Sequence, residues 1–450
     1  MPYKIWYYIG MKRWRLLVGI ILICIFLATG VMFFLAGGQE EVKVEENPFL
    51  QLRISLNDVT LEEINLGDKN TKYSGNSIEI VKGDEIFEFD NLEIKGRGNS
   101  TWGGTKKKPY QIKFENKVNF GLGKGKKWIL LADIYDPSHL RNDTAFYLAG
   151  MLDMEYSVSG EYAKLYIDDE YLGLYYLAQK IEIDKGRVDL KDPFGVIMEL
   201  DNLHGGDKGC YMSYSNNCMT ISDSVNKDNE DAAAKMFVED FSALERAVKA
   251  KNYKKVLELA DVESFAKYYL VSEFSVNPDS YSTSYHFYKD GEDDKIHAGP
   301  AWDYDFSFGN RKWIWQYNDD IYSPISMNEM KKYALGGDIY DYREGKVIKK
   351  SPNYSISKII FDLLEIPEFK YLVGQIFRES LSGRKNELIS HMNEQKDYIF
   401  DVASEDNMIW EADDFSQSAD ELINWVDTRY EFFEDEIGGR EELLELQLEY

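Results

Sequence analysis

The sequence predicts an α+β protein with a β-rich first half, a helical C-terminal region and one transmembrane helix ahead of both. Apolar and polar residues alternate in short stretches of 49–89, as they do in half-buried strands. From residue 355 onward apolar residues recur at helical spacing. These patterns divide the chain into a basic N-terminus (1–15), a transmembrane helix (16–36), a tether (37–48), a β-rich region (49–200), a region with a central hairpin (201–354), and a helical region with an acidic tail (355–450).

The N-terminal segment is predicted to cross a membrane. A helix needs about 20 apolar residues to span a bilayer, and the uncharged run from Leu16 to Ala36 has that length. The basic residues of this segment all precede the run, so the positive-inside rule places the N-terminus in the cytoplasm and the body outside the cell membrane. A cleaved signal peptide is the alternative, because small residues follow at Gly37 and Gly38.

Composition limits the classes of partner. The formal net charge is −27, and the four basic residues and no acidic one in 1–38 leave −31 on the remainder. A body of this charge repels phosphate backbones, which excludes nucleic acid as the main partner. Cys210 and Cys218 could close a small loop in an oxidising compartment. Without neighbouring His or Cys residues they make a poor zinc site.

A basic cluster in the β-rich region suggests a phosphate-binding element. The predicted strand 92–96 enters a glycine-containing bend and returns as the strand 110–114, with Arg97, Lys108 and further lysines between them. Glycines let backbone amides approach an anion, and the cations supply the counter-charge. The spacing of a Walker loop is absent, and a solvated turn is the alternative. Lys113 stands out because the sheet directs the side chain of a lysine within an apolar strand.

Two more charged residues of this region are candidates for binding. Arg141 lies in the first turn of a helix predicted from Ser138 to about Leu152, where a cation opposes the helix dipole and is expected to have a partner. Glu182 follows a predicted hairpin at 161–177. It could pair with a phosphate-binding lysine or lie on the surface.

The clearest catalytic pattern is a hairpin predicted over 281–301. A turn cluster around Gly291 separates two arms of similar length, so the ends of the hairpin should lie side by side. This places Asp279 near Asp303 and Asp305. Magnesium is usually held by one or two carboxylates together with substrate phosphates, so these side chains suit it. The alternative is that they cap turns, as Asp often does.

The order of elements around this hairpin is that of a protein kinase. Kinases place an Asp that serves as the base before a short hairpin, and a second Asp ahead of Phe-Gly holds the metal. Here a helix predicted over 261–274 leads to Asp279, and Asp303 precedes Phe308–Gly309. Helix, catalytic loop, hairpin and metal aspartate follow one another as in a kinase C-lobe.

Seven motifs in one order resemble the CotH family of spore-coat-type secretory kinases. They are R-G-N-S-T-W at 97–102, K-K-P-Y-Q-I-K-F at 107–114, K-W-I-L-L-A at 127–132, L-R-N at 140–142, Y-L-G-L-Y at 171–175, K-I-E at 180–182 and W-D-Y-D-F-S-F-G-N at 302–310. The resemblance covers about 50–435. It implies an atypical two-lobed protein-kinase-like fold, with 49–200 as the N-lobe and 201–354 as the C-lobe. It also implies that ATP and Mg²⁺ or Mn²⁺ are used to phosphorylate Ser or Thr of exported, cell-envelope or spore-coat proteins.

The resemblance also assigns roles to single residues. It implies Asp279 as the catalytic acid, Asp303 and Asp305 as metal ligands, and Lys113, Arg97, Lys108 and Glu182 as nucleotide-binding residues. Ser284 stands where kinases place the Asn that holds a second metal, so either another oxygen replaces it or metal binding is weak. Two alternatives stay open: a kinase-like fold that transfers AMP, and a pseudokinase or scaffold of the cell envelope.

Overall fold

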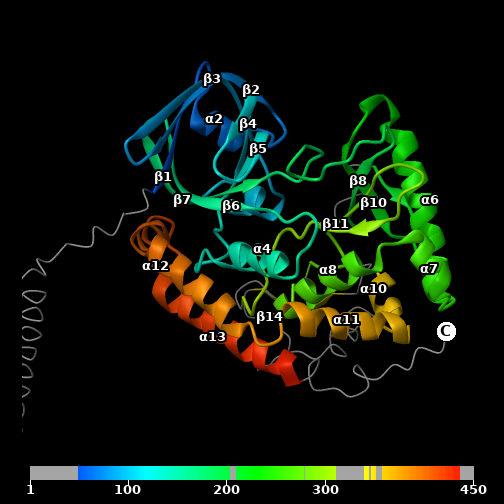
Figure 1. Cartoon of the computed structure of the whole chain (residues 1–450). Helices are drawn as coiled ribbons and strands as arrows, with labels where there is room; N and C mark the ends of the chain where they lie inside the picture. Colours follow the sequence, from blue (N-terminus) through cyan, green and yellow to red (C-terminus); the bar gives the residue numbers. More distant parts are fainter. Residues whose placement is uncertain are drawn as a thin grey trace, which may run out of the picture. The chain divides into compact units, whose positions relative to one another are not determined.

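The computed structural model describes residues 49–202, 209–277, 279–310, 339–343, 346–350 and 357–435. From Phe49 onward the chain forms one compact unit (Figure 1). The predicted segments 1–15, 16–36 and 37–48 lie outside the described residues. Within the described part of the chain, no helix is both long enough and apolar enough to cross a membrane. This finding contradicts the prediction of a single-pass membrane protein with its body outside the cell membrane.

The first third of the unit contains a closed barrel of seven strands in the order β1-β2-β3-β4-β5-β7-β6. The strands are β1 Leu50–Ser55, β2 Tyr73–Lys82, β3 Glu85–Gly96, β4 Tyr110–Asn119, β5 Lys124–Leu131, β6 Gly160–Ile167 and β7 Glu170–Gln179. Two short helices, α2 Leu61–Leu66 and α3 Ser100–Gly104, lie in the connections. Strand β1 closes the barrel, because it pairs antiparallel with β2 and parallel with β6.

Alternation along the strands directs apolar side chains to the inside of the barrel. In β1 the side chains of Leu50, Leu52 and Ile54 are buried, and the residues between them are not. Leu52 is in register with Leu165 of β6, which is also buried. These apolar side chains belong to one core inside the barrel. An open sheet would leave the facing edges of β1 and β6 unpaired.

Strand β7 joins the barrel to the rest of the unit, because both of its faces are buried. Tyr175 and Leu177 point into the barrel core, whereas Leu174, Tyr176 and Ala178 belong to a second core shared with the helices. The predicted two-lobed kinase-like fold is therefore wrong. The molecule is a mixed α+β protein in which a closed seven-stranded barrel and the second core share strands, β7 among them.

The second core contains a five-stranded sheet in the order β12-β11-β8-β10-β9. Its strands are β8 Val196–Leu200, β9 Tyr211–Met212, β10 Cys218–Ser224, β11 Tyr285–Lys289 and β12 His297–Ala298. The helices are α4 Arg141–Met151, η1 Lys227–Asn229, α6 Glu230–Lys249, α7 Tyr253–Leu259, α8 Val262–Ser275, α10 Ile359–Leu363, α11 Pro367–Ser380, α12 Lys385–Ile409 and α13 Phe415–Phe433; β13 Ile339–Arg343 pairs with β14 Lys346–Lys350.

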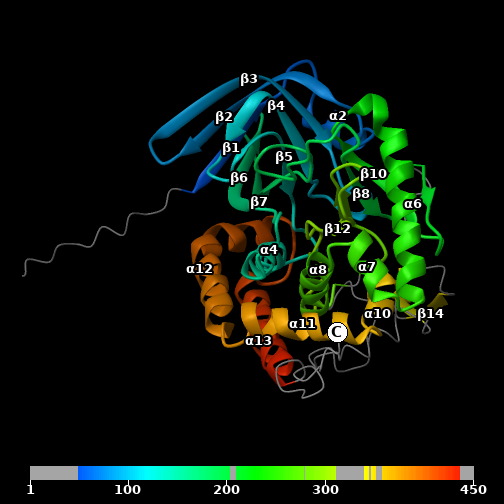
Figure 2. The ribbon, with the colours of Figure 1, turned by 45° about the vertical axis from the view of Figure 1, so that its right-hand side comes forward.

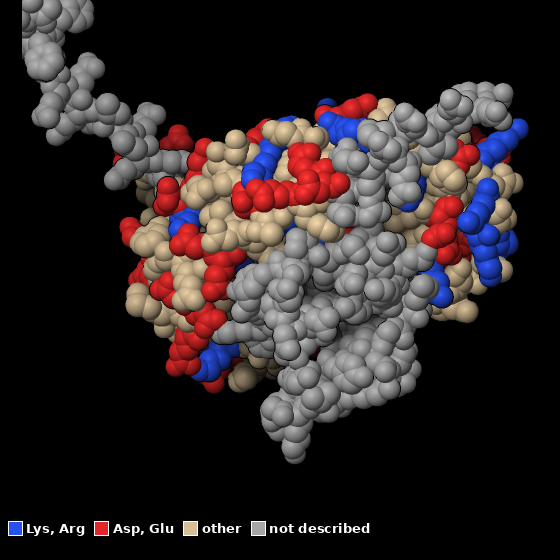
Figure 3. Space-filling view, turned by 90° about the horizontal axis from the view of Figure 1, so that it is seen from below, with Lys and Arg blue, Asp and Glu red and all other residues tan. Residues whose placement is uncertain are grey.

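Helices surround this sheet and support the strand shared with the barrel. Helix α6 contacts β8 and β10, and it runs along the outer side of the sheet in Figure 1. Helix α12 packs against both α13 and β7, and α11 packs against α8 (Figure 2). Acidic side chains are spread over the face in Figure 3, in keeping with the negative net charge.

The predicted hairpin and the helix before it are present. Strands β11 and β12 are antiparallel, with Tyr288 opposite His297, and Gly291 in the turn has φ +90°. Helix α8 differs by one residue at each end from the predicted 261–274, and the side chain of Asp261 caps it by accepting from the Ser264 N–H at 2.8 Å. The regular part of the hairpin is shorter than the predicted 281–301, because residues 279–284 form turns.

Candidate functional site

Asp279 lies on a tightly turned loop between α8 and β11. Its carbonyl oxygen accepts hydrogen bonds from the backbone N–H groups of Ser282 (3.1 Å) and Thr283 (3.0 Å). Its own N–H donates to Asn277 Oδ1 at 3.1 Å. Tyr281 has φ +68°, a left-handed conformation that is unfavourable for an aromatic residue. The surrounding contacts must therefore impose the shape of this loop.

Asp303 lies on a second loop, after β12, and two hydrogen bonds join the loops. The Ser284 hydroxyl donates to Asp303 Oδ2 at 2.8 Å, and Asn277 Nδ2 donates to the Asp303 carbonyl at 3.1 Å. Asp303 also has a left-handed backbone, with φ +71°. The structure thus brings Asp279 and Asp303 into one site from opposite sides of the hairpin. Ser284, at the position of the kinase Asn, contacts the predicted metal ligand directly.

The carboxyl groups of this site perturb one another. Burial, together with the charge of Asp303, raises the pKa of Asp279 to about 7. Burial and the charges of Asp303 and Asp279 raise the pKa of Asp305 well above its usual range, and Asp133 adds to the effect. Mutual repulsion among half-buried carboxylates is a feature of sites that hold a cation or move a proton.

Arg97, which follows β3, is a cation on which both Asp303 and Asp305 act. Burial lowers the pKa of the Arg97 guanidinium, while the charges of Asp303 and Asp305 oppose that change. The guanidinium lies over the ring of Trp302, 5.2 Å from its centroid. Because a guanidinium presents a planar set of donors that matches phosphate, Arg97 is suitably placed to bind a polyphosphate near the aspartates.

The nucleotide-binding roles of Lys113 and Lys108 stay predictions. Lys113 is on the outer face of β4, in register with Glu93 and Lys127, and no contact among the described residues joins it to the aspartates. Lys108 donates to the Trp102 carbonyl at 2.5 Å and lies over the ring of Trp102. Lys108 therefore stabilises the local bend around α3.

Glu182 forms the ion pair that the sequence left open. Its carboxylate lies 2.9 Å from the Lys127 Nζ of β5 and also pairs with Arg187. Burial lowers the pKa of the neighbouring Lys180 to about 8, although the charge of Glu182 opposes this. Sequence reasoning missed Lys127 as the partner. The available signal was its position at the start of an apolar strand next to the strand of Lys113.

A buried polar network supports the loop of Asp303. Arg141 pairs with Asp136, which confirms that this residue has a partner, and its Nε donates to the Ser307 carbonyl at 2.9 Å. Asn142 Oδ1 accepts from the Tyr304 N–H at 2.9 Å. The first turn of α4 therefore fixes the backbone of the loop that carries Asp303.

Asn142 also contacts an acidic residue that sequence reasoning did not identify. Its Nδ2 donates to Asp133 Oδ1 at 3.0 Å. Burial, reinforced by the charge of Asp136, raises the pKa of Asp133 to about 7. Asp133 and Asp136 both act electrostatically on Asp305, so the acidic cluster extends beyond the hairpin.

The aspartates fit a cation that phosphates help to hold. Among the described residues, no group of three or more His, Cys, Asp or Glu side chains is arranged to hold a metal by itself. Magnesium needs only one or two carboxylates when phosphate oxygens complete its shell. Asp303 and Asp305 would be its ligands, because a cation there would relieve the repulsion that raises the pKa of Asp305.

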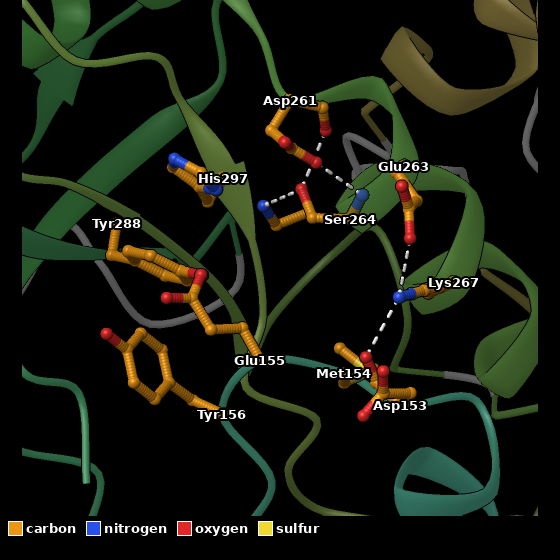
Figure 4. Close-up of a pocket in the computed structure, with 11 residues that line it drawn as sticks. Asp153, Met154, Glu155, Tyr156, Asp261, Glu263, Ser264, Lys267, Tyr288 and His297 are labelled. Carbon is orange, nitrogen blue, oxygen red and sulfur yellow. Dashed lines mark hydrogen bonds and ion pairs between the residues drawn. The ribbon is translucent and has the colours of Figure 1, made fainter.

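A cavity of about 180 Å³ lies away from these residues, between the loop after α4, the start of α8 and the β11–β12 hairpin (Figure 4). Glu155 in its wall accepts from the Tyr288 hydroxyl at 2.8 Å. Lys267 pairs with Glu263 at 2.7 Å and donates to the Asp153 carbonyl at 2.9 Å. The predicted site residues do not line this cavity, so we place the candidate chemistry at the aspartates instead.

Aspartates on either side of a hairpin, with Phe-Gly beyond the second, follow the order found in kinases. A family model described as CotH kinase protein matches residues 93–433, most of the chain. The chain therefore belongs to the CotH kinase protein family, which confirms the resemblance drawn from the motifs. A search of curated proteins gave no match.

Proposed function

We propose that this protein transfers the γ-phosphate of ATP to a Ser or Thr hydroxyl of a protein substrate, an exported, cell-envelope or spore-coat protein rich in these residues. The observation that carries the proposal is the meeting of Asp279, Asp303, Asp305 and Arg97 in one electrostatic cluster. Membership of the CotH kinase protein family supports it. The cluster offers a base, ligands for a cation and a phosphate-binding group.

Each residue has a distinct part in the proposed reaction. The substrate oxygen attacks the γ-phosphorus, the bond to the β–γ bridging oxygen breaks, and ADP leaves. Asp279 accepts the hydroxyl proton, and a pKa near 7 suits a base at neutral pH. Arg97 orients the phosphates. Bound Mg²⁺ would neutralise phosphate charge, held by Asp303 and Asp305.

The first experiment separates three reaction classes. The purified protein is incubated with Mg²⁺, a Ser/Thr-rich acceptor, and ATP labelled at either the γ- or the α-phosphate. Transfer of the γ-label alone supports the proposal, and transfer of the α-label would show AMP transfer instead. No transfer of either label, with no thermal stabilisation by ATP and Mg²⁺, would indicate a scaffold. Asp279→Asn should lower γ-transfer by about 10² or more, whereas Asp294→Asn, on the same hairpin, should not.

A second experiment asks which cation binds the phosphates. Arg97→Ala should raise the KM for ATP by roughly tenfold or more, because a charge-assisted hydrogen bond contributes about 1.5–3 kcal/mol. Lys113→Ala should change this KM much less, because no contact among the described residues joins Lys113 to the aspartates that act on Arg97. The opposite ranking would return the phosphate-binding role to Lys113 and refute the assignment of Arg97.

A further inference from the structure

A disulfide closes a short loop of the second sheet. Cys210 and Cys218 are bonded to each other, and Cys218 is the first residue of β10. Hydrogen bonds hold the loop between them to helix α6, and one carboxylate makes several of them. Glu245, which is buried, accepts from the Ser213 hydroxyl at 2.9 Å and from Asn217 Nδ2 at 2.7 Å. The disulfide and Glu245 thus both restrain one end of β10.

Hydrogen bonds connect Cys218 to the loop of Asp279. The Cys218 N–H donates to Asn202 Oδ1 at 2.7 Å, and the Asp201 N–H donates to the Cys218 carbonyl at 2.9 Å. The Asn202 N–H in turn donates to the Ser282 carbonyl at 2.8 Å. The Thr283 hydroxyl donates to Asp201 Oδ1 at 2.9 Å. The disulfide loop and the catalytic loop are therefore parts of one continuous network.

The network reaches Asp279 through its backbone. Ser282 and Thr283, which bond to Asn202 and Asp201, are the same two residues whose N–H groups donate to the Asp279 carbonyl. Asp201 is 1 % exposed, and a buried carboxylate is costly unless it is hydrogen-bonded. Its bond from the Thr283 hydroxyl is short and directional. Displacing Asp201 would therefore move the turn that presents Asp279.

We propose that Asp201 and Asn202 are positioning residues for the loop of Asp279, and that the Cys210–Cys218 disulfide makes their hold on it sensitive to redox state. The catalytic part of this proposal rests on the proposed function, whereas the structural coupling does not. On reduction the S–S bond breaks and two S–H bonds form. The two electrons and two protons come from a dithiol reductant, which closes to its own disulfide.

The proposal is tested by adding dithiothreitol to the active protein and measuring kcat and KM separately. Reduction should lower kcat about threefold to tenfold, less than the 10²-fold that 1 Å of misplacement can cost, and should leave the KM for ATP nearly unchanged. Reoxidation should restore kcat. The double variant Cys210→Ser/Cys218→Ser should have the low kcat and no response to dithiothreitol. An unchanged kcat in the reduced wild-type protein would overturn the redox part.

Hydrogen exchange supplies a readout that does not need activity. On reduction, amides in residues 279–285 should exchange faster, whereas those of β4 in the barrel should not change. Faster exchange in a protein without phosphate transfer would uphold the coupling and refute only the proposed function. Unchanged exchange together with unchanged kcat would refute the coupling while the kinase assignment stands.

Variants with the disulfide intact test the positioning residues. Asp201→Ala and Thr283→Val should each lower kcat, and the double variant should lower it no further, because both remove the same hydrogen bond. Asp201→Asn keeps an acceptor oxygen and should recover most of kcat. If the role of Asp201 were purely structural, Asp201→Ala and Asp201→Asn would both have a lower unfolding temperature, and Asp201→Asn would not recover kcat. That result would contradict the proposal.

Discussion

Replacing Asp279 with Asn tests the electrostatics of the site without any assay of activity. In the folded protein the pKa of Asp279 is raised from 3.8 to about 7 by burial and by the charge of Asp303. A group whose pKa is higher in the folded state binds protons more tightly there. Protonated Asp279 therefore contributes its full stabilising free energy below about pH 4, and this contribution is lost as the pH rises to about 7. Asn does not titrate, so Asp279→Asn lacks this loss.

The structure sets the size of the effect. The pKa rises by roughly three, and each pKa unit corresponds to about 1.4 kcal/mol, which gives an upper limit of about 4 kcal/mol. Asp279 is only partly buried, so solvent screening reduces the figure to roughly 1–2 kcal/mol. The free energy of unfolding of the wild type, relative to that of Asp279→Asn, should fall by this amount between about pH 4 and pH 7.

The measurement compares unfolding of the two proteins over this pH range, without added metal. Asp294→Asn is the control on the same hairpin. Burial alone would raise the pKa of Asp294, but hydrogen bonds from the backbone N–H groups of Asp290 and Lys295 outweigh burial, so the pKa of Asp294 is lowered. Its stabilising effect is complete above about pH 4, so its curve should run parallel to the wild type from pH 4 to 7. If the wild type instead gained stability over Asp279→Asn as the pH rose, the assignment of the raised pKa would be wrong. Added Mg²⁺ should reduce the loss.

Two further substitutions test the loop beyond the hairpin. Gly309→Ala should lower both the unfolding temperature and the activity, because Gly309 has φ +70° and an added Cβ would lie 2.5 Å from the Trp425 ring. The control Gly383→Ala has φ +75° but open space around the Cβ, so it should show only the cost of the left-handed backbone, about 1 kcal/mol. Equal effects in the two variants would contradict this prediction. Ser284→Ala removes the hydroxyl that donates to Asp303, so the Mg²⁺ concentration for half-maximal activity should rise about tenfold. An unchanged Mg²⁺ dependence would show that this hydroxyl does not orient the Asp303 carboxylate.

Local signals in the sequence predicted the elements that carry the aspartates. The cap at Asp261 and the turn at Gly291 each act within a few residues, so the start of α8 and the reversal of the hairpin could be inferred directly. That Arg141 has a partner, though not which one, was predictable for a similar reason, because a cation in the first turn of a helix needs compensation. Once the hairpin was placed, the nearness of Asp279 to Asp303 followed from its geometry.

Contacts between distant parts of the chain could not be predicted in this way. The barrel closes because β1 pairs with β6, more than a hundred residues later, and no local pattern specifies that pairing. Lys107, in the basic cluster, is fully buried and pairs at 2.9 Å with Asp406 of α12. The predicted phosphate-binding cluster is thus partly structural. Which face of β4 meets the site, and hence the place of Lys113, also depends on the closed barrel.

The two loops of the candidate site are supported by different parts of the molecule. Helix α4 fixes the loop of Asp303 through Arg141 and Asn142, whereas Asp201 of the second sheet fixes the loop of Asp279. The bonds from Ser284 and Asn277 to Asp303 are the described links between them. Because each loop has its own support, loss of a cation between the aspartates should not unfold either loop. The site would therefore keep its shape with or without a bound cation, and its geometry depends on the relative placement of α4 and the second sheet.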